Sequence, residues 1–531
     1  MNKNNIIDYI KSGKAALGIE LGSTRIKAVL TGEDYTPIAI GSYEWENRFE
    51  NGIWTYNLED ALNGLRKCYS SMISDVKSKY NVEVTKLAAI GFSAMMHGYL
   101  VFDKDGKLLT PFRTWRNTIT EDSAAELTEL FGFNIPQRWS VAHLYKEIKN
   151  DSPHVKQIAY MTTLSGYIHH MLTGQKVLGI GDASGMFPIN HDTNDYDENM
   201  LNIFDEITKQ KGYNWNLKSI LPKVLVAGED AGKLTSEGIK LLDESGILCE
   251  GIPVAPPEGD AATGMVATNS IAPRTGNVSA GTSIFAMFVL ENPLKNLHPE
   301  ADIVTTPTGK PVAMVHCNNC TSDINEWAHV LKEFCETVGC SVDMPQIFNS
   351  IFLSALKGDR DCGGLLSYNY LSGEHITEVS NGIPLFMRFA NADFTFANFA
   401  RTQVFSTLAT LRIGTDILRN EEDVKIDSLY GHGGFFKSKP TGQKLMAAAL
   451  DTPVSVMETA GEGGAWGMAI LADYMINKSN GQTLEEFLST KVFAFSESET
   501  LKPEEDDKKG FNEFMKNYIK ALDIERAASK L

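Results

Sequence analysis

The chain has 531 residues, of which 43% are hydrophobic and 22% are charged, and its formal net charge is −18. A chain of this length is too long for one hydrophobic core, so we expect a two-lobed protein with two domains. The acidic balance, without long basic runs, argues against a nucleic-acid surface or an anionic membrane surface and fits a soluble cytoplasmic enzyme. An anionic ligand would therefore need locally placed donors.

The start of the chain has no apolar stretch that ends at a small-residue cleavage site, and no apolar run of membrane-spanning length follows. We therefore expect a cytoplasmic location and no membrane partner. Seven cysteines, an odd number in a long chain, do not indicate a disulfide framework. Cys317 and Cys320, with His316, Cys335 and Cys340 nearby, could form a metal cluster. The second cysteine pair lacks CxxC spacing, so reduced structural thiols are the favoured interpretation.

Residues 15–31, AALGIELGSTRIKAVLT, predict two strands joined by a Gly-Ser-Thr turn. A hairpin differs from a P-loop, in which a strand feeds a helix, and neither GxxxxGK[ST] nor a GxGxxG that opens a helix occurs in the sequence. Gly22, Ser23 and Thr24 nevertheless offer backbone amides and two hydroxyls beside the carboxylate of Glu20. This chemistry suits a phosphate and its magnesium ion, and an ordinary hairpin turn is the alternative.

Helices and strands alternate through the rest of the first half. The pattern predicts helices over residues 57–80, 120–131 and 164–173 and a strand over Leu87 to Phe92. This alternation indicates an α/β first lobe that ends near residue 267.

The stretch from Gly251 to Ser270, GIPVAPPEGDAATGMVATNS, places Asp260 between two turns of small residues. An apolar run at 252–255 predicts a short buried strand that Pro256 and Pro257 end. Asp260 is therefore expected at a strand end. Ligands and catalytic groups collect there in α/β proteins, because the loops are open to solvent but held by a rigid sheet. Capping of backbone amides is the alternative role.

A second hydroxyl-bearing turn follows within GNVSAGTSI, where a strand-like entry runs into Gly281, Thr282 and Ser283. Similar turns near the start of each half suggest duplicated domains. Residues 394–418 have apolar side chains at helical spacing and predict a long, largely buried helix.

Two glycine-rich segments follow that helix. Residues 430–434, YGHGG, predict a turn before a helix that starts near 443; such a turn lets a base or sugar approach the backbone, and a structural turn is the alternative. Residues 461–469, GEGGAWGMA, lead into a helix that must pack closely. The polar tail predicts a charged loop over 502–509 and an amphipathic last helix near 511–522.

Nine ordered segments resemble the FGGY carbohydrate kinase family, and they cover nearly the whole chain. They read LGIELGSTRIKAVL, SAMMHGYLVFDKDGKLL, TWRNT, DASGMF, EGDAATGM, GNVSAGTS, GLLSYNYLSGE, GHGGFFKSKPTGQKLMAAALDTPV and GEGGAWGMA. The resemblance implies an α/β fold of two actin-like, ribonuclease-H-like lobes, with ATP and sugar in the cleft between them. It implies a sugar-binding N-terminal lobe over residues 1–267 and a nucleotide-binding C-terminal lobe over residues 268–531.

Through this resemblance, Asp260 matches the general base that takes the proton from the sugar hydroxyl as this attacks the γ-phosphate of ATP. A positioned base typically contributes roughly 10²–10⁴-fold to the rate. The implied ATP-binding residues form a first phosphate turn (Gly22, Ser23 and Thr24), a second phosphate turn (Gly281, Thr282 and Ser283) and an adenosine turn (Gly433, Gly434 and Ser438). Glu20 stands where the family usually has an Asp that organises Mg²⁺, so either the metal sits differently or a water fills the gap.

Met96, His97 and Gly98 resemble a segment of xylulokinases in which the Met-His pair lines the sugar site, with Met95 in place of a Gln. A glycerol kinase is expected to carry Gln-Arg-Glu there, which disfavours glycerol. Ala261 replaces the Asn that commonly follows the catalytic Asp. Because a pocket that hydrogen-bonds hydroxyls discriminates by those groups, the sugar stays open. D-xylulose is the first choice, ribulose the next, and other ketoses or polyols follow.

The departures at Glu20, Met95 and Ala261 leave an alternative of a different class. This is an actin-like, nucleotide-dependent binding protein that keeps the cleft but has lost transfer. ATP and a small sugar are the expected partners, with no nucleic acid. A homo-oligomer is compatible with the sequence, since the amphipathic tail helix could pack on its own lobe or on a neighbour.

Overall fold

The computed structural model describes residues 2–457, 463–494 and 498–531. Its contacts divide the chain into two compact units, each discontinuous in sequence. The first unit comprises Met1–Ile271, Ile303–Val312 and Gly461–Ser496, and the second comprises Ala272–Asp302, Ala313–Ala460 and Glu497–Leu531. The division into domains 1–267 and 268–531 stays a prediction, from which these units differ at 268–271, 303–312 and 461–496.

A sheet with the strand order β13-β6-β1-β2-β3 organises the first unit. Strand β1 pairs antiparallel with β2 and parallel with β6, and β13 pairs parallel with β6. The carboxyl ends of β1, β6 and β13 therefore meet at one edge. These strands are β1 (Ala16–Leu21), β2 (Arg25–Thr31), β3 (Pro37–Glu44), β6 (Ala89–Ala94) and β13 (Glu258–Gly259).

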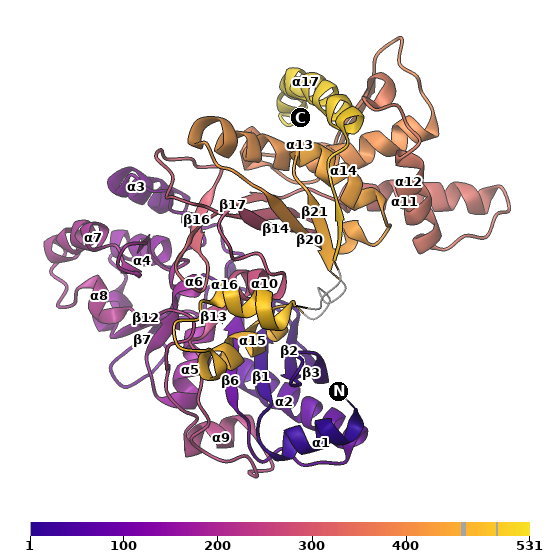
Figure 1. The fold of residues 1–531 in the computed structure, drawn as a ribbon. Helices are drawn as coiled ribbons and strands as arrows, with labels where there is room; N and C mark the ends of the chain where they lie inside the picture. The colour runs from indigo at the N-terminus through magenta and orange to yellow at the C-terminus, as the bar shows by residue number, and fades with distance from the viewer. Residues whose placement is uncertain (1, 458–462, 495–497) are drawn as a thin grey trace. The chain divides into compact units, whose positions relative to one another are not determined.

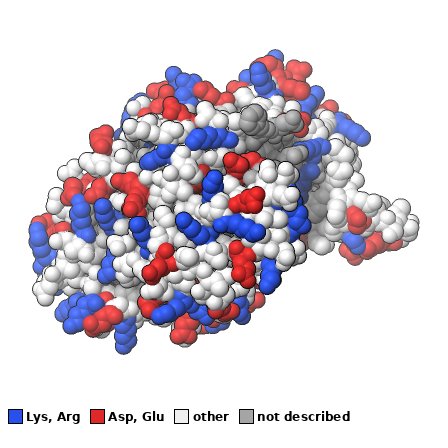
Figure 2. Space-filling view, turned by 60° about the horizontal axis from the view of Figure 1, so that its bottom comes forward, with Lys and Arg blue, Asp and Glu red and all other residues white. Residues whose placement is uncertain are grey.

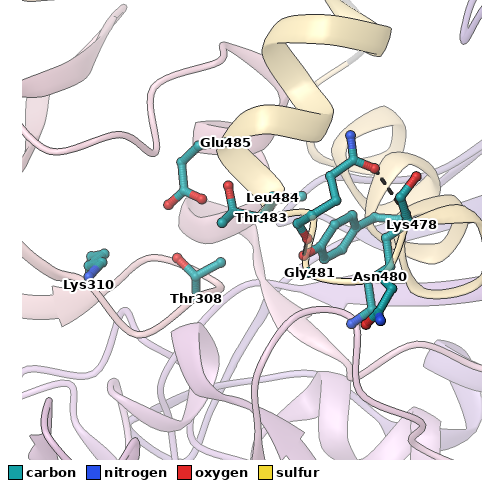
Figure 3. A pocket seen from close by; sticks show the side chains of 11 residues that line it. Thr308, Lys310, Lys478, Asn480, Gly481, Thr483, Leu484 and Glu485 are labelled. Carbon is teal, nitrogen blue, oxygen red and sulfur yellow. Dashed lines mark hydrogen bonds between the residues drawn. The ribbon is translucent and has the colours of Figure 1, made fainter.

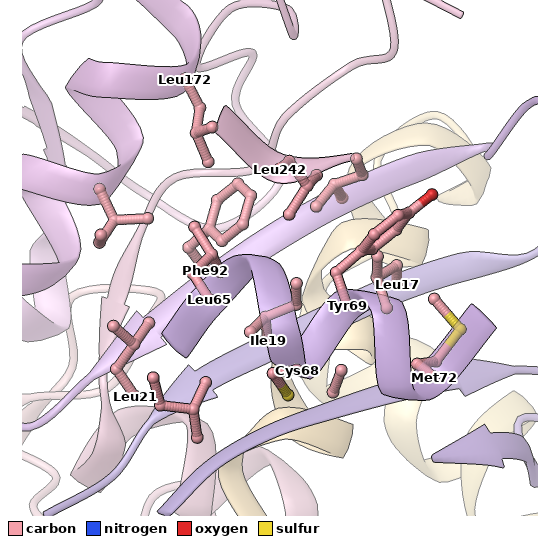
Figure 4. Packing of buried hydrophobic residues seen from close by; sticks show 14 of the residues in the cluster. Leu17, Ile19, Leu21, Leu65, Cys68, Tyr69, Met72, Phe92, Leu172 and Leu242 are labelled. Atoms are coloured by element: carbon pink, nitrogen blue, oxygen red, sulfur yellow. The ribbon is translucent and has the colours of Figure 1, made fainter. Parts of the chain in front are cut away.

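Helices cover both faces of this sheet. Leu17, Ile19 and Leu21 of β1 point to the face covered by α2 (Leu58–Tyr80), where they pack in a buried cluster with Leu65 and other apolar side chains (Figure 4). Because strand residues alternate between faces, the residues between them point to the other face. That face is covered by α15 (Gly463–Asn477), which lies beside β1 and β6 in Figure 1 although it is far away in the sequence.

Glycines allow both helices to approach the sheet closely. A Cβ added to Gly18 of β1 would lie 2.1 Å from the carbonyl oxygen of Ala465 in α15. A Cβ added to Gly41 of β3 would lie 2.3 Å from the carbonyl oxygen of Cys68 in α2. Backbone therefore rests on backbone at both positions, and any larger residue would displace a helix.

Shorter elements complete the first unit. Its other strands are β4 (Arg48–Glu50), β5 (Ile53–Thr55), β7 (Leu100–Phe102), β8 (Tyr160–Thr162), β9 (Val177–Gly179), β10 (Ile189–Asn190), β11 (Asp195–Tyr196), β12 (Lys223–Leu225) and most of β16 (Asp302–Thr305). Its other helices are α1 (Lys3–Lys11), α3 (Glu121–Phe131), α4 (Ser140–Lys149), α5 (Leu164–Thr173), α6 (Ile180–Ala183), α7 (Glu198–Gln210), α8 (Leu217–Ile220), α9 (Ser236–Leu242), α10 (Asp260–Ala267) and α16 (Leu484–Phe487). Among the described residues, no helix is long and apolar enough to span a membrane.

In the second unit, strands lie in the order β17-β15-β14-β20-β21-β22. Its strands are β14 (Thr275–Ala280), β15 (Ile284–Val289), most of β17 (Pro311–Cys317), β18 (Leu365–Tyr368), β19 (Leu385–Arg388), β20 (Ser428–His432), β21 (Val454–Met457) and β22 (Ser498–Leu501). Its helices are α11 (Ser322–Thr337), α12 (Met344–Ala355), α13 (Phe396–Glu422), α14 (Thr441–Leu450) and α17 (Glu505–Ala528). The long, largely buried helix expected near 394–418 is confirmed as α13.

Most predicted elements are confirmed, including the two hairpins and the helix over Leu164–Thr173. Three are wrong in position. Residues 430–432 of the expected turn YGHGG belong to strand β20, and only Gly433 and Gly434 lie beyond its end. The strand expected at 252–255 is reduced to two isolated bridges, from Val254 to Ile90 and from Pro253 to Lys233, and β13 follows the two prolines instead. The charged loop expected over 502–509 is helical from Glu505, because three acidic side chains in the first turn of α17 stabilise its N-terminus. The first two residues of GEGGAWGMA lie outside the described residues.

Candidate active site

Three of the predicted site segments follow adjacent strands of the first unit. Glu20 lies near the end of β1, Met96 and His97 follow β6, and Asp260 follows β13. Because these strands are parallel, their carboxyl ends lie at the same edge of the sheet. The structure therefore brings these residues together within one unit.

Asp260 begins α10, and backbone donors orient its half-buried carboxylate. Oδ1 accepts hydrogen bonds from the backbone N–H of Met96 at 3.3 Å and of Ala261 at 3.0 Å. Gly259 leaves no room for a side chain, since a Cβ there would lie 2.2 Å from Cγ of Met96. Burial raises the pKa of Asp260 to about 6, and the backbone donors oppose this rise. Asp260 is thus a carboxylate at neutral pH and a stronger base than an exposed Asp.

Glu20 faces α15, on the same side of β1 as Gly18. A Cβ on Gly464 would lie 2.6 Å from Oε1 of Glu20, and the backbone N–H of Ala465 donates to its carboxylate. Burial, and then the charge of Asp260, raise the pKa of Glu20 to about 7, whereas Lys27 lowers it. Glu20 therefore lies at the N-terminus of α15 and within electrostatic reach of Asp260.

His97 is held in one orientation and one charge state. Its φ of +69° is in the left-handed region, and Gly98 follows at +94°. Nδ1 lies 3.1 Å from the carbonyl oxygen of Gly185, and the ring stacks on Trp139. Burial, and then the nearby Arg138, lower the pKa of His97 to about 3. Since a carbonyl oxygen can only accept, the neutral ring carries its proton on Nδ1, and Nε2 is an acceptor.

Two fully buried carboxyl groups beside Asp260 were absent from the predicted site. Glu258 accepts hydrogen bonds from the backbone N–H of Asp182 at 2.9 Å and of Gly181 at 3.4 Å. Asp182 accepts from the hydroxyl of Thr163 at 2.7 Å and from Ser165. Burial, and for Glu258 also the charge of Asp182, raise the pKa of Asp182 to about 7 and of Glu258 to about 8. The Glu-Gly-Asp spacing is visible in the sequence, whereas pairing with a residue 76 positions earlier is not.

The first phosphate turn has its carbonyl groups held from one side. Trp45 Nε1 donates to the carbonyl of Gly22 at 2.7 Å, and its backbone N–H donates to that of Thr24 at 3.2 Å. The hydroxyl of Tyr56 donates to the carbonyl of Ser23 at 2.6 Å, and the two aromatic rings stack 4.3 Å apart. C=O and N–H point in opposite directions in a trans peptide, so the amides of Ser23 and Thr24 point away from the aromatic pair, whereas the N–H of Gly22 donates to the carbonyl of Arg25 at 3.0 Å.

The second phosphate turn is held in a similar way within the second unit. The backbone N–H of Cys320 donates to the carbonyl of Thr282 at 3.0 Å. Thr321 donates to the carbonyl of Gly281 through its N–H at 3.1 Å and through its hydroxyl at 2.7 Å. The amides of Thr282 and Ser283 therefore point away from the loop that holds the carbonyls.

The adenosine turn lies next to the second phosphate turn. Gly433 has a φ of +105°, and a Cβ there would lie 2.3 Å from the carbonyl oxygen of Ala280, the residue before Gly281. Gly434 is exposed, and a Cβ there would meet no atom within 4 Å. The carbonyl of Ser438 accepts from the N–H of Thr441 at 3.1 Å, at the start of α14. The two glycines thus permit close packing on one side and leave open space on the other.

A separate cavity of about 530 Å³ lies in the first unit (Figure 3). Its lining comes from Thr308 and Lys310 and from residues 474 and 478–485. The ammonium group of Lys478 donates to the carbonyl of Gly228 at 2.8 Å. None of the predicted site residues lines this cavity.

Charge and thiols add little to the site. Figure 2 shows a face on which acidic and basic side chains are interspersed. Cys317 and Cys320 are buried free thiols, and burial raises the pKa of Cys320 to about 12.

Within the described ranges, no group of three or more His, Cys, Asp or Glu side chains could hold a metal ion. Any cation at the carboxyl edge of the first sheet would therefore need ligands besides protein carboxylates.

Two family models match the chain: the FGGY family of carbohydrate kinases, N-terminal domain, over residues 15–267, and its C-terminal domain, over residues 276–476. The xylulose kinase of Haemophilus influenzae is 23% identical over 518 residues, which cover 95% of this chain and 99% of the relative. The solved xylulose kinase from Rhodospirillum rubrum has a TM-score of 0.79 at 16% identity, covering 98% of this chain and 100% of that one. The gluconate kinase from Lactobacillus acidophilus has a TM-score of 0.78 at 18% identity, covering 97% and 98%. The expected α/β fold with two actin-like lobes is thereby confirmed.

Proposed function

Because the chain belongs to the FGGY family of carbohydrate kinases, we propose that it transfers the γ-phosphate of ATP to a hydroxyl of a ketopentose, with D-xylulose as the first choice. Phosphorylation of a sugar with ATP follows from the family. The choice of D-xylulose is supported by a xylulose kinase that matches along nearly its whole length and by the Met96-His97 pair. Ribulose and other ketoses or polyols are the next candidates.

Asp260 is the proposed general base, and its contacts are the observation that carries the proposal. Two backbone N–H groups hold Oδ1, so that Oδ2 is the oxygen assigned to take the proton of the sugar hydroxyl. The raised pKa of about 6 suits this role, because the best base has a pKa near the working pH and is still ionised there. The hydroxyl oxygen, as it loses the proton, attacks the γ-phosphorus of ATP, and ADP leaves.

The two phosphate turns are proposed to bind the phosphate groups of ATP through their amides. In both turns the carbonyls are held from behind, by Trp45 and Tyr56 in one and by Cys320 and Thr321 in the other. Successive amides that point to the same side form a cradle for an anion. Gly433, Gly434 and Ser438 are proposed to receive the adenosine group.

Glu20 is proposed to hold a magnesium ion as an oxygen donor. The electrostatic repulsion between Glu20 and Asp260, which contributes to the raised pKa of Glu20, would be relieved by a divalent cation beside Glu20. Glu20 would hold the ion directly or through a water. Bound Mg²⁺ would neutralise negative charge on the phosphate groups.

His97 is proposed to select the sugar. As a neutral ring that donates from Nδ1 to the carbonyl of Gly185, it offers Nε2 as an acceptor to a sugar hydroxyl. Met96 packs against Gly259 and so places this segment beside the base.

An ADP-release assay tests the proposal. The acceptors are D-xylulose, D-ribulose, L-ribulose, L-fuculose, gluconate and glycerol, each with saturating MgATP. We expect D-xylulose to give the highest kcat/KM. A higher value with another acceptor would reassign the substrate, and no sugar-dependent ADP release with any of them would contradict the proposed transfer.

A further inference from the structure

The loop that holds the second phosphate turn is itself held by a buried carboxylate. Glu374 is 0% exposed and accepts hydrogen bonds from the backbone N–H of Asn318 at 2.9 Å and of Asn319 at 3.4 Å. It also accepts from Nδ2 of Asn319 at 3.2 Å. Burial raises the pKa of Glu374 to about 7, and the hydrogen bonds from Asn318 and Asn319 oppose this rise. Glu374 therefore fixes both peptide groups at the start of the loop.

The same loop is braced by neighbours of Glu374 in the sequence. Oδ1 of Asn319 accepts from the backbone N–H of Ser372 at 3.0 Å, and Nδ2 of Asn369 donates to the carbonyl of Cys320 at 2.8 Å. Cys320 and the next residue are those that donate to the carbonyls of the second phosphate turn. Glu374 is thus linked to that turn, within the second unit, through its hydrogen bonds to Asn318 and Asn319 and through the peptide bond from Asn319 to Cys320.

We propose that Glu374 is a positioning residue for ATP, which acts by holding loop 318–321 so that the amides of the second phosphate turn point at the phosphate groups. Glu374 acts through Asn318 and Asn319 and does not touch the nucleotide. The inference rests on the proposed function, because it requires that this turn binds phosphate. It gives a role to the segment GLLSYNYLSGE, which the transfer step leaves unused.

Two substitutions of Glu374 separate positioning from charge. Glu374→Gln keeps the shape and one oxygen that can accept from Asn318 and Asn319, so KM for ATP should stay within about threefold of the wild-type value. Glu374→Ala removes Oε2, which accepts all three hydrogen bonds from Asn318 and Asn319, and KM for ATP should rise roughly tenfold or more. KM for the sugar should change by less than about threefold in both variants, since the residues proposed to bind sugar belong to the first unit.

Glu525→Ala is the matched control. Glu525 is also 0% exposed, lies in the second unit and accepts from the backbone N–H of Ile383 at 3.1 Å, but it is not on the path to the turn. Its removal should lower the thermal unfolding temperature without changing KM for ATP. Thr321→Val is the second test variant, because it deletes only the hydroxyl that donates to Gly281 and should raise KM for ATP about threefold.

An ATP-specific rise in KM in Glu374→Ala and Thr321→Val, with recovery in Glu374→Gln, would support the inference. Unchanged KM for ATP in Glu374→Ala, or equal rises in KM for ATP and for sugar, would overturn it. If Glu374→Ala does not fold, Thr321→Val provides the test. A rise in KM for ATP alone would support the inference, and an unchanged KM for ATP or equal rises for ATP and sugar would overturn it. Failure of the proposed function looks different, because the wild-type protein would then release no ADP in response to any sugar.

Discussion

The carboxylate of Asp260 accepts a hydrogen bond from the backbone N–H of Met96, the residue before His97. This bond joins the carboxyl end of β6 to the first residue of α10. The proposed base and the proposed sugar-binding histidine are therefore fixed relative to each other by backbone geometry. Such fixed placement is what a positioned base requires.

Replacement of Asp260 by Asn tests the base. Asn keeps the size of the side chain and an oxygen that can accept from Met96, but it cannot take a proton. We expect kcat for sugar phosphorylation to fall roughly 10²–10⁴-fold, with the Kd for ATP within about twofold of wild type. ADP release and calorimetric titration with ATP measure the two quantities. A kcat close to the wild-type value would remove Asp260 from the chemistry.

The pH dependence of turnover reports the same group. Because the pKa of Asp260 is about 6 and only the carboxylate can act as a base, kcat/KM for the sugar should rise with pH up to about 6 and level off above it. Initial rates at saturating MgATP give the profile. Brief exposure to the lowest pH followed by assay at neutral pH controls for unfolding. A profile that is flat down to about pH 5 would contradict the assignment.

Replacement of His97 by Phe tests sugar binding. The variant keeps a stacked aromatic ring but loses the acceptor Nε2, so KM for the sugar should rise about tenfold while KM for ATP stays constant. His143→Phe is the control, because His143 is another buried histidine of the first unit and lies outside the proposed site. Equal effects of the two substitutions would show that His97 acts only in packing.

Replacement of Glu20 by Gln tests the magnesium assignment. The amide keeps the volume beside α15 but removes the charge, so the Mg²⁺ concentration for half-maximal activity should rise roughly tenfold. Activity is measured against Mg²⁺ at constant ATP. Glu20→Asp shortens the side chain to the family's usual residue and should be milder. An unchanged Mg²⁺ requirement in Glu20→Gln would exclude a role for this carboxylate with the metal.

Stability should fall as pH rises because of the buried acids. The pKa of Glu258 is about 8 in the folded protein against an ordinary value of 4.5. Between pH 4.5 and about pH 8, Glu258 holds a proton in the folded chain that it has released in the unfolded chain. The free energy of unfolding therefore decreases as pH increases through this range. Glu258→Gln should flatten the dependence of the unfolding temperature on pH. Parallel profiles for the two proteins would contradict this explanation.

The sequence predicts local structure well where hydrophobic pattern and turn residues agree. The hairpin around Gly22 and the helix over Leu164–Thr173 are examples. It misplaces β13, because an apolar run before Pro256 looks like a strand, whereas pairing with β6 decides which residues extend the sheet. The local sequence pattern of a segment does not show which distant strand that segment will pair with.

Long-range packing explains what the sequence leaves out of the site. No local sequence pattern indicates that α15 packs against Gly18 in the first unit. None indicates that the backbone N–H of Asp182 donates to the carboxylate of Glu258. Asp182 belongs to the segment DASGMF, which resembles the family, but the burial of its carboxyl group follows only from the fold. Contacts of this kind depend on which elements meet, and that information is distributed over the whole chain.

The protein has a net charge of −18, yet the two phosphate turns are proposed to bind the polyanion ATP. Their donors are peptide dipoles, which carry no net charge and do not titrate. Attraction of this kind acts at short range in a fixed direction, whereas long-range steering depends on ionic strength. The proposed recognition of the nucleotide would therefore depend on backbone geometry and not on the overall charge of the surface, so that substitutions of surface charges should leave the affinity for the phosphate groups nearly unchanged.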